Sequence, residues 1–191
     1  MRSVSSEKIR EKNMTEVRRY HGLLVGLHWV LALMISVALF MGSTALESMP
    51  NSDPGKVDAL RGHMTVGLLI GILLVLRLLT RLSTQHPPHA STGMAWADRL
   101  APLAHWALYG LVALMVASGV GMALAFDLSA VVFQGQGSLP EDFHDSPARL
   151  AHGLVAKLLL LTIVAHVAAA LYHQWVRKDR LLSRMGWGPR R

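Results

Sequence analysis

Four long apolar stretches alternate with polar segments along this chain. They cover about residues 20–46, 62–80, 100–126 and 150–176. An α-helix rises about 1.5 Å per residue, so about 20 apolar residues cross the roughly 30 Å hydrocarbon core of a bilayer. The first stretch is longer than the apolar region of a signal peptide, and we expect it to be retained. The pattern predicts an all-α protein, an integral membrane four-helix transmembrane bundle.

The polar segments carry the residues that end helices and form turns. Residues 47–61 contain two prolines and a glycine, and residues 82–97 contain two adjacent prolines. Both segments are therefore predicted as loops. Residues 127–149 form the longest connection, which is acidic and has room for a short interfacial helix.

Lys and Arg residues indicate which side of the membrane each segment faces. Fifteen of them lie before the first span, around residues 77–99 and after residue 176, whereas the other two connections hold three. Because positively charged loops stay in the cytoplasm, both termini are predicted to be cytoplasmic and the acidic connection periplasmic. We expect a cytoplasmic arm at residues 1–19, one transmembrane domain at 20–180 and a basic cytoplasmic tail at 181–191.

Composition agrees with a membrane protein and limits its chemistry. Hydrophobic residues make up 52% of the chain and charged residues only 16%, which is far from the balance of a soluble domain. The chain has no cysteine, so cysteine-ligated clusters, a thiolate-bound haem and covalent c-type haem attachment are excluded. The net charge of +7 comes from residues that flank the spans, and we therefore expect no nucleic acid among the partners.

Histidines inside the spans are the candidate functional residues, because an ionisable group in a membrane is costly. His152 and His166 lie fourteen residues apart in the fourth span. In a helix this separation is about 3.9 turns and roughly 21 Å of rise, so the two imidazoles share nearly one face. Such spacing suits a helix that gives one axial ligand to each of two stacked haems.

Depth in the membrane predicts the other two ligands. His63 and His152 both lie just inside the outer boundary, whereas His28 and His166 lie deeper from the inner boundary. A haem held edge-on between helices needs its two axial nitrogens at similar depth. We therefore predict that His63 pairs with His152 and that His28 pairs with His166. The alternative, interfacial or hydrogen-bonded histidines, does not account for the matching depths.

Other ionisable residues near the spans receive weaker predictions. His105 on the third span is an alternative ligand, although a role beside a ligand or near a quinone fits its position better. His21 and His173 lie at headgroup level and are read as interfacial residues, with a place near a haem propionate as the alternative. Lys157 is rotated about 140° from His152 on an ideal helix, and no role is assigned to it.

Arginines near the boundaries are candidate partners for haem propionates, which are anionic. Arg77 is predicted for the inner haem, because it lies a turn deeper than Arg81, which positive-inside anchoring already explains. Arg61, or alternatively Arg149, is predicted for the outer haem. Small residues in the second and third spans would let helices or a flat macrocycle approach closely, and they are Gly67, Gly71, Gly110, Ser118, Gly119 and Gly121.

Short motifs surround the histidines of all four spans. They are LHW at 27–29, RGHMTVG at 61–67, RLLTR at 77–81, LAHWALYG at 103–110, AHGL at 151–154 and AHVAAALYH at 165–173. Over about residues 20–180 the chain resembles the bacterial cytochrome b-561 family of four-helix di-haem inner-membrane proteins. The resemblance implies two b-type haems with bis-histidine ligation, the cytoplasmic-side haem on His28 and His166 and the periplasmic-side haem on His63 and His152. Gly153 departs from the family, which commonly has an acidic residue there.

The resemblance further implies electron exchange with the quinone pool and, in some members, oxidation of superoxide at the outer face. We predict a di-haem b-type cytochrome that transfers electrons across the inner membrane between a periplasmic-side donor and quinone. The first alternative is a haem-carrying anchor and electron conduit for a soluble hydrogenase- or dehydrogenase-type subunit, docked on residues 127–149. A haem-free histidine transporter is disfavoured, because the spans lack Asp and Glu.

Overall fold

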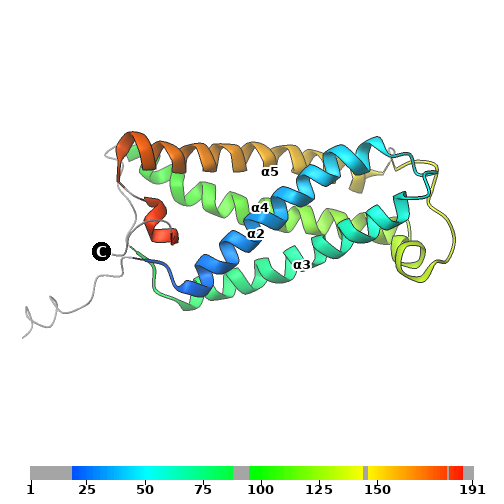
Figure 1. Ribbon diagram of the computed structural model, residues 1–191, viewed down its shortest axis with the longest axis horizontal. Helices are drawn as coiled ribbons and strands as arrows, with labels where there is room; N and C mark the ends of the chain where they lie inside the picture. Colours follow the sequence, from blue (N-terminus) through cyan, green and yellow to red (C-terminus); the bar gives the residue numbers. More distant parts are fainter. Residues whose placement is uncertain (1–18, 88–94, 144–145, 180, 187–191) are drawn as a thin grey trace, which may run out of the picture.

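Four long helices form the body of the molecule in a computed structural model (Figure 1). The structure describes residues 19–87, 95–143, 146–179 and 181–186, and within these residues it contains helices and no strand. The long helices are α2 (Gly22–Met41), α3 (Lys56–Ser83), α4 (Ala95–Ala125) and α5 (Pro147–Tyr172). The predicted all-α fold is therefore confirmed.

Short helical segments extend or connect the long helices. Two π-helical turns, η1 (Gly42–Leu46) and η3 (His173–Arg177), continue α2 and α5. A third, η2 (Ala130–Gln134), lies in the connection between α4 and α5, where the sequence suggested an interfacial helix. A 3₁₀ turn, η4 (Leu181–Met185), follows α5.

All four long helices are long and apolar enough to cross a membrane. The candidate spans are Gly22–Leu46, Lys56–Ser83, Asp98–Ala125 and Pro147–Arg177. Large apolar side chains on their outer surfaces are exposed, for example Leu33 at 67% and Leu161 at 67%. Such surfaces would aggregate in water but are the surfaces that lipid requires.

Helix boundaries differ from the apolar stretches mainly at the polar ends. The second helix begins at Lys56 rather than near residue 62, the third at Ala95 rather than 100, and the fourth at Pro147 rather than 150. Polar residues can continue a helix beyond the hydrocarbon layer, so hydropathy alone underestimates helix length. The predicted arm at residues 1–19 lies outside the described residues except for Arg19, and the predicted tail is described only to Gly186.

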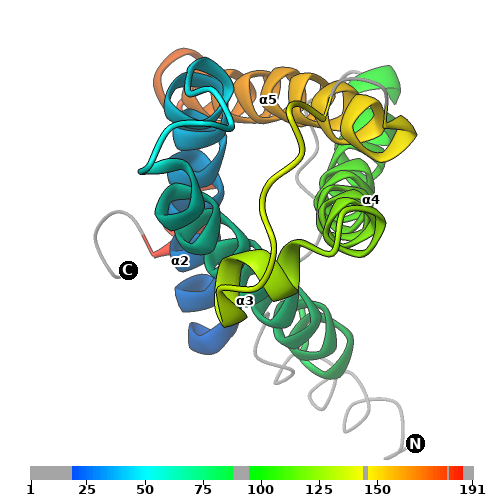
Figure 2. The ribbon, with the colours of Figure 1, turned by 90° about the vertical axis from the view of Figure 1, so that its right-hand side faces the viewer.

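Consecutive helices run in opposite directions along the bundle (Figure 1), and Figure 2 shows from one end how the four helices surround its interior. Consecutive helices pack against each other, α2 with α3, α3 with α4 and α4 with α5. Tyr20 and η4 lie at the same end of the bundle, opposite the connections from η1 to α3 and from α4 to α5 (Figure 1). We refer to the end with Tyr20 as the inner end and to the other as the outer end.

An apolar layer half-way along the bundle contains one buried residue from each of the four long helices. These residues are Leu31, Ile70, Val112 and Leu159, and each of them is 5% exposed or less. Partly buried apolar side chains from the same helices surround this layer. Because lipid tails are as apolar as these side chains, van der Waals packing in this layer stabilises the arrangement of the four helices.

Lys56 fixes the outer end of the bundle. Its side chain is buried, and its Nζ donates hydrogen bonds of 2.6 Å to the carbonyl oxygens of Leu46 and Met49. Those carbonyls belong to the end of η1 and the residues after it, which lack partners within the helix. Lys56, in the first turn of α3, therefore caps the end of the preceding span.

The chain after α5 folds back across the inner end. The indole Nε1 of Trp29 donates to the carbonyl of Met185 at 3.0 Å, and the backbone nitrogen of Tyr20 donates to the carbonyl of Arg184 at 3.3 Å. Gly186 has φ +91° and lies against Val25. These contacts join the last described turn to the start of α2.

Candidate haem sites

Residues that face the bundle interior recur every seven positions on each helix. Seven residues are about two helical turns, so they lie in line along one face. The four series are His28, Ile35 and Gly42; His63, Ile70 and Arg77; His105, Val112 and Gly119; and His152, Leu159 and His166. Because neighbouring helices run in opposite directions, the series form an inner, a middle and an outer layer, with the apolar core in the middle.

The outer layer brings together the first predicted pair. The imidazole centroids of His63 and His152 are 6.2 Å apart, and the ring planes meet at 73°. Each ring lies against a glycine: a Cβ on Gly42 would be 3.5 Å from Cε1 of His63, and a Cβ on Gly119 would be 3.4 Å from Cε1 of His152. The two glycines, on the opposite helices, let the rings approach the backbone.

The two outer histidines differ in their hydrogen bonds. Nδ1 of His152 lies 3.0 Å from Oγ of Ser118, whose hydroxyl is also 3.0 Å from the carbonyl oxygen of Met115. Nδ1 of His63 is buried and has no hydrogen-bond partner among the described residues. A buried ring nitrogen without a hydrogen-bond partner is costly in a closely packed protein core. It is less surprising where the ring borders a site for another molecule.

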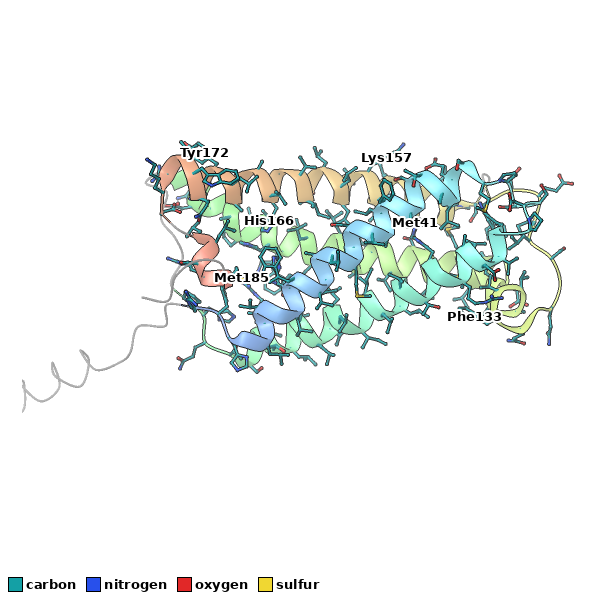
Figure 3. The ribbon with its side chains drawn as sticks, viewed as in Figure 1. Met41, Phe133, Lys157, His166, Tyr172 and Met185 are labelled. Atoms are coloured by element: carbon teal, nitrogen blue, oxygen red, sulfur yellow. The ribbon has the colours of Figure 1, made fainter. Side chains whose placement is uncertain are left out.

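The inner layer brings together the second predicted pair and a third imidazole. The ring centroids of His28 and His166 are 6.4 Å apart, with ring planes at 69°. The ring of His105 lies 5.6 Å from that of His166. In Figure 3, His166 points from α5 towards the other helices. His105 thus lies beside the predicted pair.

Arg77 belongs to the same inner layer. Its guanidinium donates a hydrogen bond to the hydroxyl of Tyr109 and has one nitrogen 3.5 Å from Nδ1 of His28. Its Cζ is 5.1 Å from the centroid of the Tyr109 ring. Tyr109 was not predicted as a site residue. The sequence contained a clue to this role, because an arginine within a span needs a polar partner on a neighbouring helix.

The outer arginines make contacts near the membrane boundary. Nε of Arg61 donates to the carbonyl of Val132 at 2.8 Å, and its Nη1 pairs with Asp58 at 2.5 Å. Arg149 lies 3.8 Å from Glu47, and its Nη1 would be only 2.9 Å from a Cβ on Gly153. The guanidinium of Arg149 therefore covers Gly153.

The remaining predicted positions lie outside the two pairs. The ring of His173 makes a 2.5 Å contact through Nδ1 to the carboxylate of Asp179, and that of His21 accepts a hydrogen bond from the backbone nitrogen of Leu23 at the start of α2. Lys157 is exposed and points away from the bundle (Figure 3). These contacts agree with interfacial and local structural roles.

The donor set suits a haem better than a bare metal ion. In the part of the chain that the structure describes, no three His, Cys, Asp or Glu side chains gather closely enough to hold a metal ion. A metal held by protein alone normally has about four ligands, whereas a porphyrin supplies four and needs only axial ones. Facing pairs of imidazoles therefore fit a haem iron.

Helices of membrane length with imidazole pairs at both ends of the interior define a class, the membrane cytochromes b. The family model for prokaryotic cytochrome b561 matches residues 19–188. The chain belongs to the prokaryotic cytochrome b561 family. It is accordingly a multi-pass protein of the bacterial inner membrane that binds haem b and transfers electrons.

Curated relatives resemble the chain over nearly its whole length. It is 27% identical over 175 residues to a probable superoxide oxidase CybB of Yersinia pestis, covering 88% of this chain and 96% of the relative. It is 25% identical over 180 residues to cytochrome b561 homolog 1 of Escherichia coli, covering 88% and 97%. It is 28% identical over 176 residues to cytochrome b562 of Cereibacter sphaeroides, covering 90% and 98%.

Proposed function

We propose that the chain binds two haems b, each between two histidines, and transfers electrons across the inner membrane. His63 and His152 would hold the outer haem, and His28 and His166 the inner one. The observation that carries the proposal is the presence of two facing imidazole pairs, 6.2 Å and 6.4 Å apart, at opposite ends of one bundle.

The ring separations support ligation by both members of each pair. Two metal–imidazole bonds of about 2 Å, together with the distance of about 1 Å from each nitrogen to its ring centre, require roughly 6 Å between centroids. The contact between His105 and His166, at 5.6 Å, is shorter than both pairs. The separations of His166 from His28 and from His105 both differ from the required distance by about 0.4 Å. Ring spacing therefore does not choose between His28 and His105, and the pairing of His28 with His166 rests on the matching depth of the two residues in their spans.

Bis-histidine ligation determines the type of chemistry. When bound, the haems supply one-electron transfer. Imidazole nitrogens on both sides leave no open position for oxygen, so electron transfer fits better than oxygen binding. The helices fix the two pairs at separate depths, and the apolar layer with Leu31, Ile70, Val112 and Leu159 excludes water between them.

Two arginines complete the proposed haem sites. Arg77, from the inner layer, would neutralise a propionate of the inner haem, since it already lies beside His28. Arg61 would do so for the outer haem, although its guanidinium also bonds to Val132 and Asp58. Arg149 is the alternative outer cation, because it lies one turn before His152.

The proposed donor is on the periplasmic side, and the acceptor is the quinone pool. The relative from Yersinia pestis, a probable superoxide oxidase, makes superoxide one candidate donor. With both termini in the cytoplasm, the pair formed by His63 and His152 would face that donor. The chain would then act as a quinone-linked oxidoreductase.

A second candidate is an electron conduit for a soluble redox subunit. The outer end contains a hollow of about 700 Å³, lined by residues of the two outer connections such as Asn51, Arg61 and Glu141. A hollow of this kind could receive part of a partner. Purification of the chain with a periplasmic subunit would favour the conduit, and quinone reduction by the isolated chain would favour the first proposal.

Haem stoichiometry tests the proposed ligands. We expect two haems b per chain in detergent-purified protein by pyridine haemochrome assay. His152→Ala and His166→Ala should each retain about half of the haem, because each removes one ligand pair. The control His86→Ala changes an exposed histidine outside the helices and should retain both. Haem-free wild-type protein, made with ample haem, would refute the proposal.

A further inference from the structure

Ser118 is placed to control the outer histidine of α5. It lies on α4, and its Oγ is 3.0 Å from Nδ1 of His152 and 3.0 Å from the carbonyl oxygen of Met115. A hydroxyl has one proton and two lone pairs, so it can donate one hydrogen bond and accept others. A carbonyl oxygen can only accept. The Ser118 proton therefore goes to Met115, and the oxygen is free to accept from the imidazole.

This assignment fixes the tautomer of His152. With Nδ1–H donating to Ser118, the lone pair of the neutral ring lies on Nε2. Gly119, the next residue on α4, leaves the ring room, since a Cβ there would lie 3.4 Å from Cε1. The serine and the glycine thus hold the ring in one orientation with its ligating nitrogen free.

The other proposed ligands have different surroundings. Nδ1 of His63 has no partner among the described residues. Nδ1 of His28 faces the guanidinium of Arg77 at 3.5 Å, which has donors and no acceptor. The acceptor beside His152 is therefore a specific feature of the outer site. The serine was visible in the sequence only as a small residue suited to helix packing.

We propose that Ser118 is a positioning residue that orients His152 and strengthens it as an iron ligand. The inference rests on the proposed ligation of the outer haem by His63 and His152. A ring that donates its second N–H to an acceptor is a more basic ligand. A more basic axial ligand stabilises the oxidised iron, so Ser118 lowers the midpoint potential of the outer haem.

Redox titration of the purified full-length holoprotein tests this role. Ser118→Ala removes the hydroxyl acceptor, leaves the carbonyl of Met115 as the remaining acceptor near the His152 ring, and should raise the midpoint potential of one of two haems. The expected change is roughly tenfold in the one-electron equilibrium, about 59 mV. The ferric EPR signal of the same haem should shift. Ser118→Cys, of similar volume but a weak acceptor, should behave like Ser118→Ala, whereas Ser118→Thr should restore the wild-type values.

A matched control separates the hydrogen bond from general effects on the helices. Ser36 also lies in a span, and its Oγ bonds only to the carbonyl of Ala32 in its own helix at 2.7 Å. Ser36→Ala should leave both potentials unchanged. Loss of one haem from Ser118→Ala, with both retained in Ser118→Thr, would support the same conclusion.

Three results would overturn the inference. They are two unchanged potentials in Ser118→Ala, equal shifts of both haems, or wild-type potentials in Ser118→Cys, which would assign the effect to volume. In each case wild-type protein with two haems would leave the proposed function standing. A wild-type protein without haem would instead refute the proposed function and the inference with it.

Discussion

At the scale of the residue, Arg77 shows how a charge is accommodated inside the bundle. An arginine at the centre of a span costs about 2.5–3.5 kcal/mol on insertion scales, and Arg77, which lies nearer the inner end of α3, costs less. Here its guanidinium bonds to the hydroxyl of Tyr109 and lies 5.1 Å from the centre of that ring. The ring of His28 provides a third contact. A cation is therefore held beside the inner imidazole pair by groups from two other helices.

This cation should raise the potential of the inner haem, because positive charge favours the reduced iron. We expect Arg77→Met to lower one of the two midpoint potentials, by roughly tenfold in the equilibrium or about 59 mV. Arg77→Lys should lower this midpoint potential less, since it keeps the positive charge. Redox titration of the purified protein measures both.

Arg81 is the matched control for Arg77. It lies one turn nearer the inner end on α3, with its Cζ 5.9 Å from the centre of the Trp106 ring. Arg81→Met should shift the potentials less than Arg77→Met. Equal shifts in the two variants would mean that general surface charge, and not the position of Arg77, determines the potential.

At the scale of the element, the seven-residue recurrence sets how the helices face each other. A stripe that repeats every seven residues keeps one face of a helix towards its neighbours over several turns. The same rotation that buries Leu159 therefore also directs His152 and His166 inwards. In α3, α4 and α5, packing of the apolar layer and placement of the imidazoles follow from the same rotation of the helix, whereas in α2 the buried Leu31 lies outside the seven-residue series.

Close approach of α3 and α4 depends on Gly71. A Cβ at this position would lie 3.2 Å from Cγ1 of Val116. We expect Gly71→Leu to destabilise the bundle by about 1–3 kcal/mol through overpacking. Thermal loss of the haem absorption in detergent should then occur at a lower temperature than in the wild-type protein.

Gly67 provides the comparison, because it lies one turn away on α3 and a Cβ there would meet nothing within 4 Å. Gly67→Leu should change the transition temperature little. If both variants were equally destabilised, loss of glycine itself, and not the contact with Val116, would explain the effect.

At the scale of the whole molecule, the bundle is asymmetric from end to end. The inner end is closed by the chain that follows α5, which bonds to Trp29 and Tyr20. The outer end holds Lys56 as a cap, and a second apolar cluster formed by Leu60, Leu128 and Val132. Both described ends of the chain lie together at the inner end (Figure 1).

The orientation of this asymmetric bundle in the membrane is a testable prediction. The distribution of Lys and Arg places the inner end in the cytoplasm. Green fluorescent protein fused after Arg191 should fluoresce, and alkaline phosphatase fused there should be inactive. Alkaline phosphatase fused after Gly137, in the outer connection, should be active. The reverse pattern would place the His63–His152 pair in the cytoplasmic half of the membrane.

The amino-acid sequence by itself determined the number of spans and the residues at matching depth. Hydropathy and helical rise are local properties of a chain, so they were enough to predict four helices and to place His63 at the depth of His152 and His28 at the depth of His166. The structure brings the rings of each pair close together. Helix ends were less predictable, because the polar first turn of α3 depends on the capping of η1 by Lys56.

Only the tertiary structure decided which side chains meet across helices. The contacts of Ser118 with His152, of Tyr109 with Arg77 and of Gly42 with His63 each join two helices. These contacts depend on how each helix is rotated about its axis and on which helix lies next to it. No local sequence pattern specifies either. The same holds for the return of the chain after α5 to Trp29, because a hydrogen bond between residues 156 positions apart leaves no periodic trace in the sequence.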